Sequence, residues 1–152
     1  MPVVYHTRTA QQDLAYRHYP DLVAMARDVD TLVLILPGGP ATRNLITAEV
    51  LAALGANGIL INVARGTVVD EPALVAALQN GTIRAAGLDV FADEPNVPEA
   101  LLSMDNVVLL PHVGSGTHYT RTAMGQLVAD NLLSWFAGKG PLTPVVETPW
   151  PR

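Results

Sequence analysis

The sequence contains no cysteine, which excludes disulfide bridges and thiolate metal sites. Its histidines do not have the spacing of a metal-binding HExxH motif, so we expect no metal site. The apolar runs are also short, and none reaches the roughly 18 residues that a membrane-spanning helix needs. The first residues, "MPVVYHTR", lack a basic leader followed by an apolar segment, so we expect no signal peptide. These features predict a cytoplasmic protein without membrane contact.

Positive charge is scarce as well. Nine Lys and Arg residues face 14 Asp and Glu residues, which gives a formal net charge of -5. An acidic balance disfavours nucleic acid and anionic membranes as partners. The 152 residues, 49% of them hydrophobic, suit one globular domain with a real core.

Five short apolar runs rich in Val, Leu and Ile predict β-strands. They are continuous rather than alternating, a pattern typical of strands buried on both faces of a parallel sheet. The runs cover residues 2–6, 31–36, 58–64, 85–91 and 106–111.

Helical patterns lie between these runs. Residues 21–29 form a short one, residues 47–55 begin at a candidate N-cap and end at Gly55, and residues 70–81 begin at Asp70 and end at a glycine. A longer helix is expected to end at Gly138. Its apolar stripe consists of Met124, Leu127, Val128, Leu132, Trp135 and Phe136. Strands that alternate with helices predict an α/β fold with a doubly wound parallel sheet.

Functional residues of such sheets lie just past the carboxyl ends of the strands. Three successive strand ends carry complementary groups: Arg65, then Asp89 and Glu94, then His112. A carboxylate beside an imidazole favours the protonated ring, which suits a general acid. A guanidinium in the same space can bind a substrate carboxylate through two hydrogen bonds. Each such residue, taken alone, is more often a solvated loop residue or a helix cap, and the spacing does not name a reaction.

Two longer segments of the sequence resemble a known enzyme family. "INVARGTVVDEPALVAALQNGTIRAAGLDVFADEP" and "NVVLLPHVGSGT" together resemble the signature region of the D-isomer-specific 2-hydroxyacid dehydrogenases. The segment "PHVGSGTHYTRTAMGQLVADNL" is similar to the glyoxylate/hydroxypyruvate reductase branch of that family. The resemblance runs from about Val3 to the last helix. It implies an NAD(P)-dependent oxidoreductase that moves hydride between the cofactor and a small 2-oxo acid, such as glyoxylate or hydroxypyruvate.

The resemblance also implies roles for individual residues. Arg65 would bind the carboxylate and carbonyl of the substrate, and His112, paired with Glu94, would protonate the carbonyl oxygen. Asp89 would lie near the nicotinamide carboxamide, with two further residues against the ring. The complete expected cofactor-binding set is Thr7, Arg8, Pro37, Ala64, Asp89, Gly114 and Ser115.

The choice of cofactor has its own signal. An acidic residue after the second strand of a dinucleotide fold usually holds the adenosine ribose, whereas a nearby arginine accommodates a 2′-phosphate. Here Thr7 stands where the acid is expected, and Arg8 follows it. The sequence therefore favours NADP(H) over NAD(H), with a merely solvated arginine as the alternative.

The glycine fingerprint of the fold is absent, since no glycine precedes Gly38. Gly39 also stands where the family commonly has Thr, which removes any side-chain contact from that position. We therefore expect an incomplete Rossmann fold that lacks the first strand and the glycine-rich loop, as in the carboxyl-terminal part of a longer enzyme. The partial NAD(P)-binding domain is expected over residues 1–138, followed by an extended tail over 139–152.

A missing first strand would leave a gap at the centre of the strand order 3-2-1-4-5-6. We expect this gap to separate residues 2–6 and 31–36 from the other strands and to expose two apolar edges. The expected consequence is a homo-oligomer, such as a dimer, or pairing with a missing N-terminal part.

Two other functional classes remain open. One is a non-catalytic dinucleotide-binding or interaction module derived from the family. The other is a hydrolase that uses Ser115 with His112, although the G-x-S-x-G elbow is lacking. Substitution of Arg65, Glu94 and His112 separates the first from an enzyme, because a scaffold does not depend on them.

Overall fold

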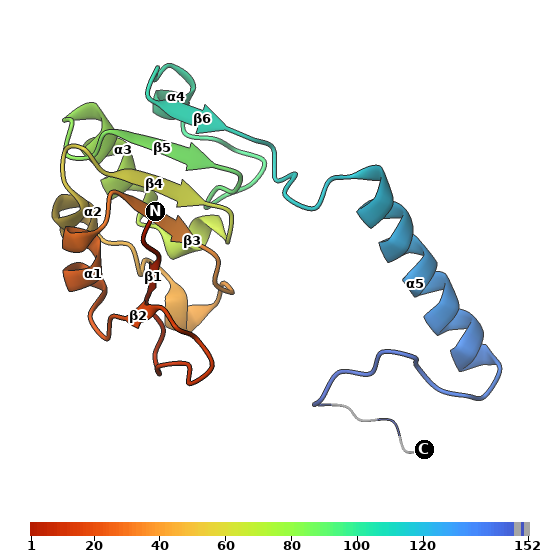
Figure 1. Cartoon of the computed structure of the whole chain (residues 1–152). Helices are drawn as coiled ribbons and strands as arrows, with labels where there is room; N and C mark the ends of the chain where they lie inside the picture. Colours follow the sequence, from red (N-terminus) through yellow and green to blue (C-terminus); the bar gives the residue numbers. More distant parts are fainter. Residues whose placement is uncertain (148–149, 151–152) are drawn as a thin grey trace. The chain divides into compact units, whose positions relative to one another are not determined.

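The fold was analysed in a computed structural model, which describes residues 1–147 and 150. The chain divides into two compact units, Met1–His112 and Val113–Arg152 (Figure 1). The expected division into a domain over 1–138 and a tail over 139–152 stays a prediction.

The first unit opens with a small parallel sheet of two short strands, β1 (Val4–Tyr5) and β2 (Arg17–His18). Helix α1 (Leu22–Asp28) follows, and the Asp21 carboxylate caps it by accepting hydrogen bonds from the backbone N–H groups of Val23 and Ala24. The sequence analysis missed β2, because two residues are too few to carry a periodic pattern.

A larger sheet forms the rest of this unit. Its strands β3 (Thr31–Leu34), β4 (Ile59–Asn62), β5 (Ala85–Leu88) and β6 (Val107–Leu109) are all parallel and lie in chain order (Figure 1). The expected α/β fold with parallel sheets is thus confirmed. Residues 2–6 do lie in a separate sheet, as expected. The separation expected for residues 31–36 is wrong, because β3 pairs with β4 along its whole length.

Helices connect the parallel strands. Helix α2 (Ala48–Leu54) lies between β3 and β4, α3 (Glu71–Gln79) between β4 and β5, and α4 (Glu99–Leu102) between β5 and β6. Both predicted N-caps are confirmed: the Thr47 hydroxyl accepts from Val50 N–H, and the Asp70 carboxylate accepts from Ala73 N–H. Two 3-10 turns, η1 (Pro40–Thr42) and η2 (Gly66–Val68), were not predicted.

Burial alternates along the strands of the larger sheet. Leu32, Leu60 and Leu88 are buried and share one core with residues of α1, α2 and α3. On the opposite face, Val33 is 51% exposed and Val108 is 64% exposed. The expectation of strands buried on both faces is therefore wrong for residues 1–112, because an apolar run records which side chains can be buried, not which face is covered.

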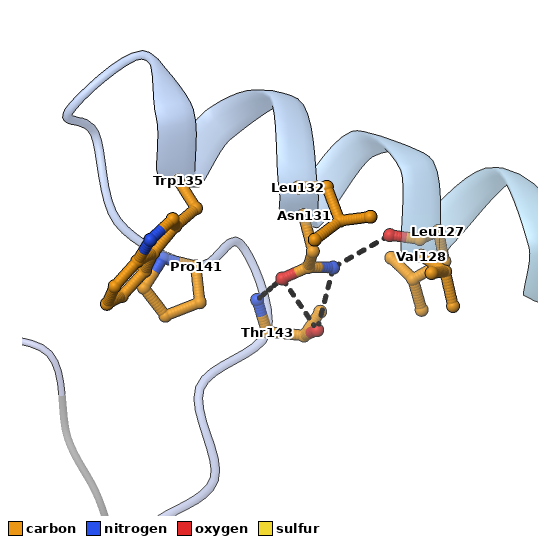
Figure 2. A pocket seen from close by; sticks show the side chains of 7 residues that line it. All are labelled: Leu127, Val128, Asn131, Leu132, Trp135, Pro141 and Thr143. Carbon is orange, nitrogen blue, oxygen red and sulfur yellow. Dashed lines mark hydrogen bonds between the residues drawn. The ribbon is translucent and has the colours of Figure 1, made fainter.

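The second unit is built on α5 (His118–Phe136), capped by the Thr117 hydroxyl, which accepts from Thr120 N–H. The chain after the helix folds back along it, and Asn131 accepts hydrogen bonds from Leu142 N–H and Thr143 N–H. Figure 2 shows the bond from Thr143. No residue of α5 is buried within the unit, so its predicted apolar stripe is present but exposed. Among the described residues, no helix combines the length and hydropathy that a membrane span requires.

Gly66, the first residue of η2, packs closely against the backbone of the loop after β5. A Cβ atom at this position would lie 1.9 Å from the carbonyl carbon of Phe91 and 2.4 Å from the amide nitrogen of Ala92. We expect Gly66→Ala to lower the free energy of unfolding by about 3 kcal/mol or more, because backbone atoms cannot yield as a flexible side chain can. Urea unfolding measures the change. The control is Gly125→Ala in α5, where a Cβ meets nothing within 4 Å and the helix gains about 0.5–1 kcal/mol. Equal urea midpoints for G66A and the parent chain would contradict this packing.

Candidate functional site

A buried amide holds the loop that carries Arg65. Asn62, at the end of β4, is only 1% exposed. Its Nδ2 donates to the carbonyl oxygen of Arg65 at 3.1 Å, and its Oδ1 accepts from Ala64 N–H at 3.0 Å. Both ends of the amide are thus satisfied by the loop, which fixes where the Arg65 backbone leaves the sheet. The sequence analysis missed this residue, although a polar residue inside an apolar run was the available signal.

The Arg65 side chain is exposed at the start of η2. Its Nη1 donates to the carbonyl oxygen of Ala64 at 2.6 Å. The remaining donors of the guanidinium can serve a carboxylate, since the group carries five N–H bonds in a fixed plane.

Glu94 and His112 form the central contact of the site. Glu94 lies in the loop after β5, and its Oε1 accepts from Phe91 N–H at 3.0 Å. Its other oxygen, Oε2, lies 2.8 Å from Nδ1 of His112, which follows β6. His112 has a φ of 55°, a left-handed conformation that is uncommon outside glycine. The pairing implied by the family resemblance is present in the structure, while the catalytic roles stay predictions.

The surroundings of Glu94 favour its ionised form. The hydrogen bond from His112, the backbone N–H of Phe91 and the positive charges of His112 and Arg65 together lower the pKa of the Glu94 carboxyl below its ordinary 4.5. Glu94 therefore carries its charge at neutral pH. The two side chains are 35% and 45% exposed, so a small molecule can reach the pair.

The expected cofactor-binding residues are distributed over several strand ends. Ala64 and Asp89 are buried directly after β4 and β5, and Pro37 is exposed beyond β3. Thr7 and Arg8 follow β1, where the Thr7 hydroxyl donates to the carbonyl oxygen of Thr9 at 2.7 Å. The remaining two, Gly114 and Ser115, belong to the second unit and are not placed relative to the others.

The donor chemistry of the first unit fits part of a dinucleotide. The exposed Arg8 guanidinium suits a phosphate, and the buried Asp89 carboxylate suits an amide donor. The sequence before Gly38 offers no glycine-rich loop for a pyrophosphate. Within the described part of the chain, no three His, Asp or Glu side chains are grouped as metal ligands.

A hollow of about 380 Å³ lies elsewhere, in the second unit. It is apolar and contains none of the candidate residues. Figure 2 shows its lining: Leu127, Val128, Asn131, Leu132, Trp135, Pro141 and Thr143.

Known proteins resemble this chain along nearly all of its length. Glyoxylate/hydroxypyruvate reductase A of Arabidopsis thaliana is 51% identical over 145 residues, which are 95% of this chain and 46% of that protein. Hydroxyphenylpyruvate reductase of Plectranthus scutellarioides is 50% identical over the same shares. The crystal structure of an NADPH-dependent glyoxylate/hydroxypyruvate reductase from Sinorhizobium meliloti, in complex with NADP and malonate, matches with a TM-score of 0.93 and 58% identity. It covers 99% of this chain and 47% of its own.

The chain thus spans a little under half the length of these relatives. A family model for the D-isomer specific 2-hydroxyacid dehydrogenase NAD binding domain matches residues 1–114. The chain belongs to the D-isomer specific 2-hydroxyacid dehydrogenase family, as a part of its NAD-binding domain.

Proposed function

We propose that this chain carries the acid/base pair and the substrate-binding arginine of a reductase that moves hydride between NADP(H) and a small 2-oxo acid. Glyoxylate and hydroxypyruvate are the substrates named for two of the relatives. The observation that carries the proposal is the contact of 2.8 Å between Glu94 and His112, with the charge of Arg65 acting on the same carboxylate.

In this proposal Glu94, His112 and Arg65 have different roles. Because an ionised Glu94 can only accept, Nδ1–H of His112 donates the hydrogen bond to it, which leaves Nε2 to deliver a proton to the carbonyl oxygen of the substrate. Arg65 would hold the substrate carboxylate, which orients the carbonyl group. When bound, the reduced nicotinamide supplies the hydride that the carbonyl carbon accepts, and the product is a 2-hydroxy acid.

An alternative is a non-catalytic dinucleotide-binding or interaction module. The two functions differ in whether His112 matters, which makes this residue the decisive one.

Association with another polypeptide is part of the proposal. Strand β3 lies at one edge of the larger sheet, where Val33 is 51% exposed, and Ile35, just after the strand, is 81% exposed. Apolar edge strands readily pair with other chains. The open edge supports a homo-oligomer or pairing with a complementary N-terminal part. The cytoplasmic location stays a prediction.

Replacement of the acid/base residue tests the reductase. His112→Asn keeps a polar side chain but removes the titratable ring, so we expect kcat for the NADPH-dependent reduction of glyoxylate to fall by about 10²–10⁴-fold. Steady-state oxidation of NADPH measures it. His118→Asn, at the exposed start of α5, is the matched control and should keep the parent rate. Parent activity that survives H112N would refute the assigned acid.

The cofactor preference is tested at Arg8. We expect the chain to bind NADPH more tightly than NADH and Arg8→Ala to reduce that preference about 10–100-fold, the value of one charge-assisted contact to a phosphate. Titration calorimetry with both cofactors measures it, and Arg84→Ala, another exposed arginine of the first unit, is the control. Equal affinities of the parent chain for the two cofactors would be evidence against an NADP(H) site.

Self-association is tested by light scattering at low micromolar concentration. We expect the parent chain to exceed its monomer mass of 16.1 kDa and Val33→Lys to shift it towards the monomer, because a lysine on an edge strand opposes pairing. Leu102→Lys, on the exposed surface of α4, is the control. A parent chain that is purely monomeric would count against the homo-oligomer.

A further inference from the structure

One loop decides where the Glu94 carboxylate lies. After β5 the chain is buried through Phe91, and residues 92–96 are exposed. A hydrogen bond from the backbone N–H of Asn96 to the carbonyl oxygen of Asp93, at 2.8 Å, closes the turn that follows. The peptide between Phe91 and Ala92 is therefore the point at which the loop leaves the core.

Two groups from another part of the chain hold this peptide. Gly66 packs directly against it, close enough that a Cβ would overlap its atoms. The N–H of the same peptide, which belongs to Ala92, donates a hydrogen bond to Oε2 of Glu71 at 3.0 Å. Phe91 N–H, one residue earlier, donates to Glu94 itself. The peptide held by Glu71 thus adjoins the amide that holds the Glu94 carboxylate.

Glu71 is well placed to act as a fixed anchor. It is the first residue of α3, directly after the capping Asp70, and its side chain is half-buried. Helix α3 is anchored in the core by Leu74, Ala77 and Leu78. A carboxylate on a packed helix that accepts a backbone N–H forms a charge-assisted bond, stronger than one between neutral groups.

From this arrangement we propose that Glu71 is a positioning residue, which fixes the loop at Ala92 and thereby aligns Glu94 with His112. Its effect is one of geometry. The charges that act on the Glu94 carboxyl are those of His112 and Arg65, so the contribution of Glu71 is transmitted through the backbone of residues 91–94. The consequence for catalysis rests on the proposed function, whereas the alignment of the pair does not.

The test compares three variants of the whole chain by NMR. Glu71→Ala removes the acceptor, Glu71→Gln keeps an uncharged acceptor of the same length, and Glu49→Ala is the control, since Glu49 occupies the first turn of the neighbouring helix α2. Carbon-detected titration gives the pKa of the Glu94 carboxyl, and amide exchange reports on Ala92 N–H.

We expect E71A to raise the Glu94 pKa towards its ordinary 4.5 and to speed exchange at Ala92, while E71Q and E49A stay close to the parent chain. A Glu94 pKa that is unchanged in E71A would overturn the proposal. Equal upward shifts in E71A and E71Q would also overturn it, because an acceptor at this position would then not be what aligns the loop. A lowered pKa in both variants would overturn it too, because loss of the Glu71 negative charge alone has that effect.

Activity separates this inference from the proposed function. If the parent chain reduces glyoxylate, E71A should lower kcat by about 10–100-fold with a smaller change in KM, as expected for a misplaced catalytic group. If the parent chain is inactive but E71A still raises the Glu94 pKa, the positioning role stands and the reductase proposal fails.

Discussion

Hydrophobic burial of one face of the larger sheet governs the structure of residues 1–112. Leu32, Leu60 and Leu88, from three neighbouring strands, pack into the same core as the helices that connect the strands. That packing requires the strands to run in one direction, because each returns through a helix on the covered side. Parallel strands end at a common edge, so the loops after β4, β5 and β6 emerge together. For this reason Arg65 and His112 both act on the Glu94 carboxylate, although 47 positions separate Arg65 from His112 in the sequence.

The sequence predicted those features that depend on local chemistry. The strand β4 and the caps Thr47 and Asp70 follow from side chains whose preferences do not depend on distant residues. The pairing of β3 and the open face of the sheet do not, since both depend on which other segments are available to cover an apolar surface. A run such as "TLVLIL" has the same composition whether one of its faces is covered or both are.

In the candidate site, too, some residues could be predicted from the sequence and others could not. Glu94 and His112 were found because carboxylate and imidazole are chemically distinctive and stand at strand ends. Asn62, Glu71 and the Phe91 amide were missed. Each of them bonds to or through a backbone group, and every residue has such groups, so the residue types do not reveal the partner; only Asn62, as a polar residue inside an apolar run, left a signal in the sequence. The contact between Glu71 and Ala92 spans 21 positions and becomes visible only once β5 and α3 are packed.

The left-handed backbone of His112 has a consequence for how this family member can change. A residue with a side chain in that conformation costs roughly 1–2 kcal/mol relative to an ordinary one, and glycine would relieve the cost. Selection for stability alone therefore pushes this position towards glycine, while retention of an imidazole opposes it. If His112 is the proposed acid, the position is a compromise between folding and chemistry, and a change to glycine there would indicate that the proposed reaction had been lost.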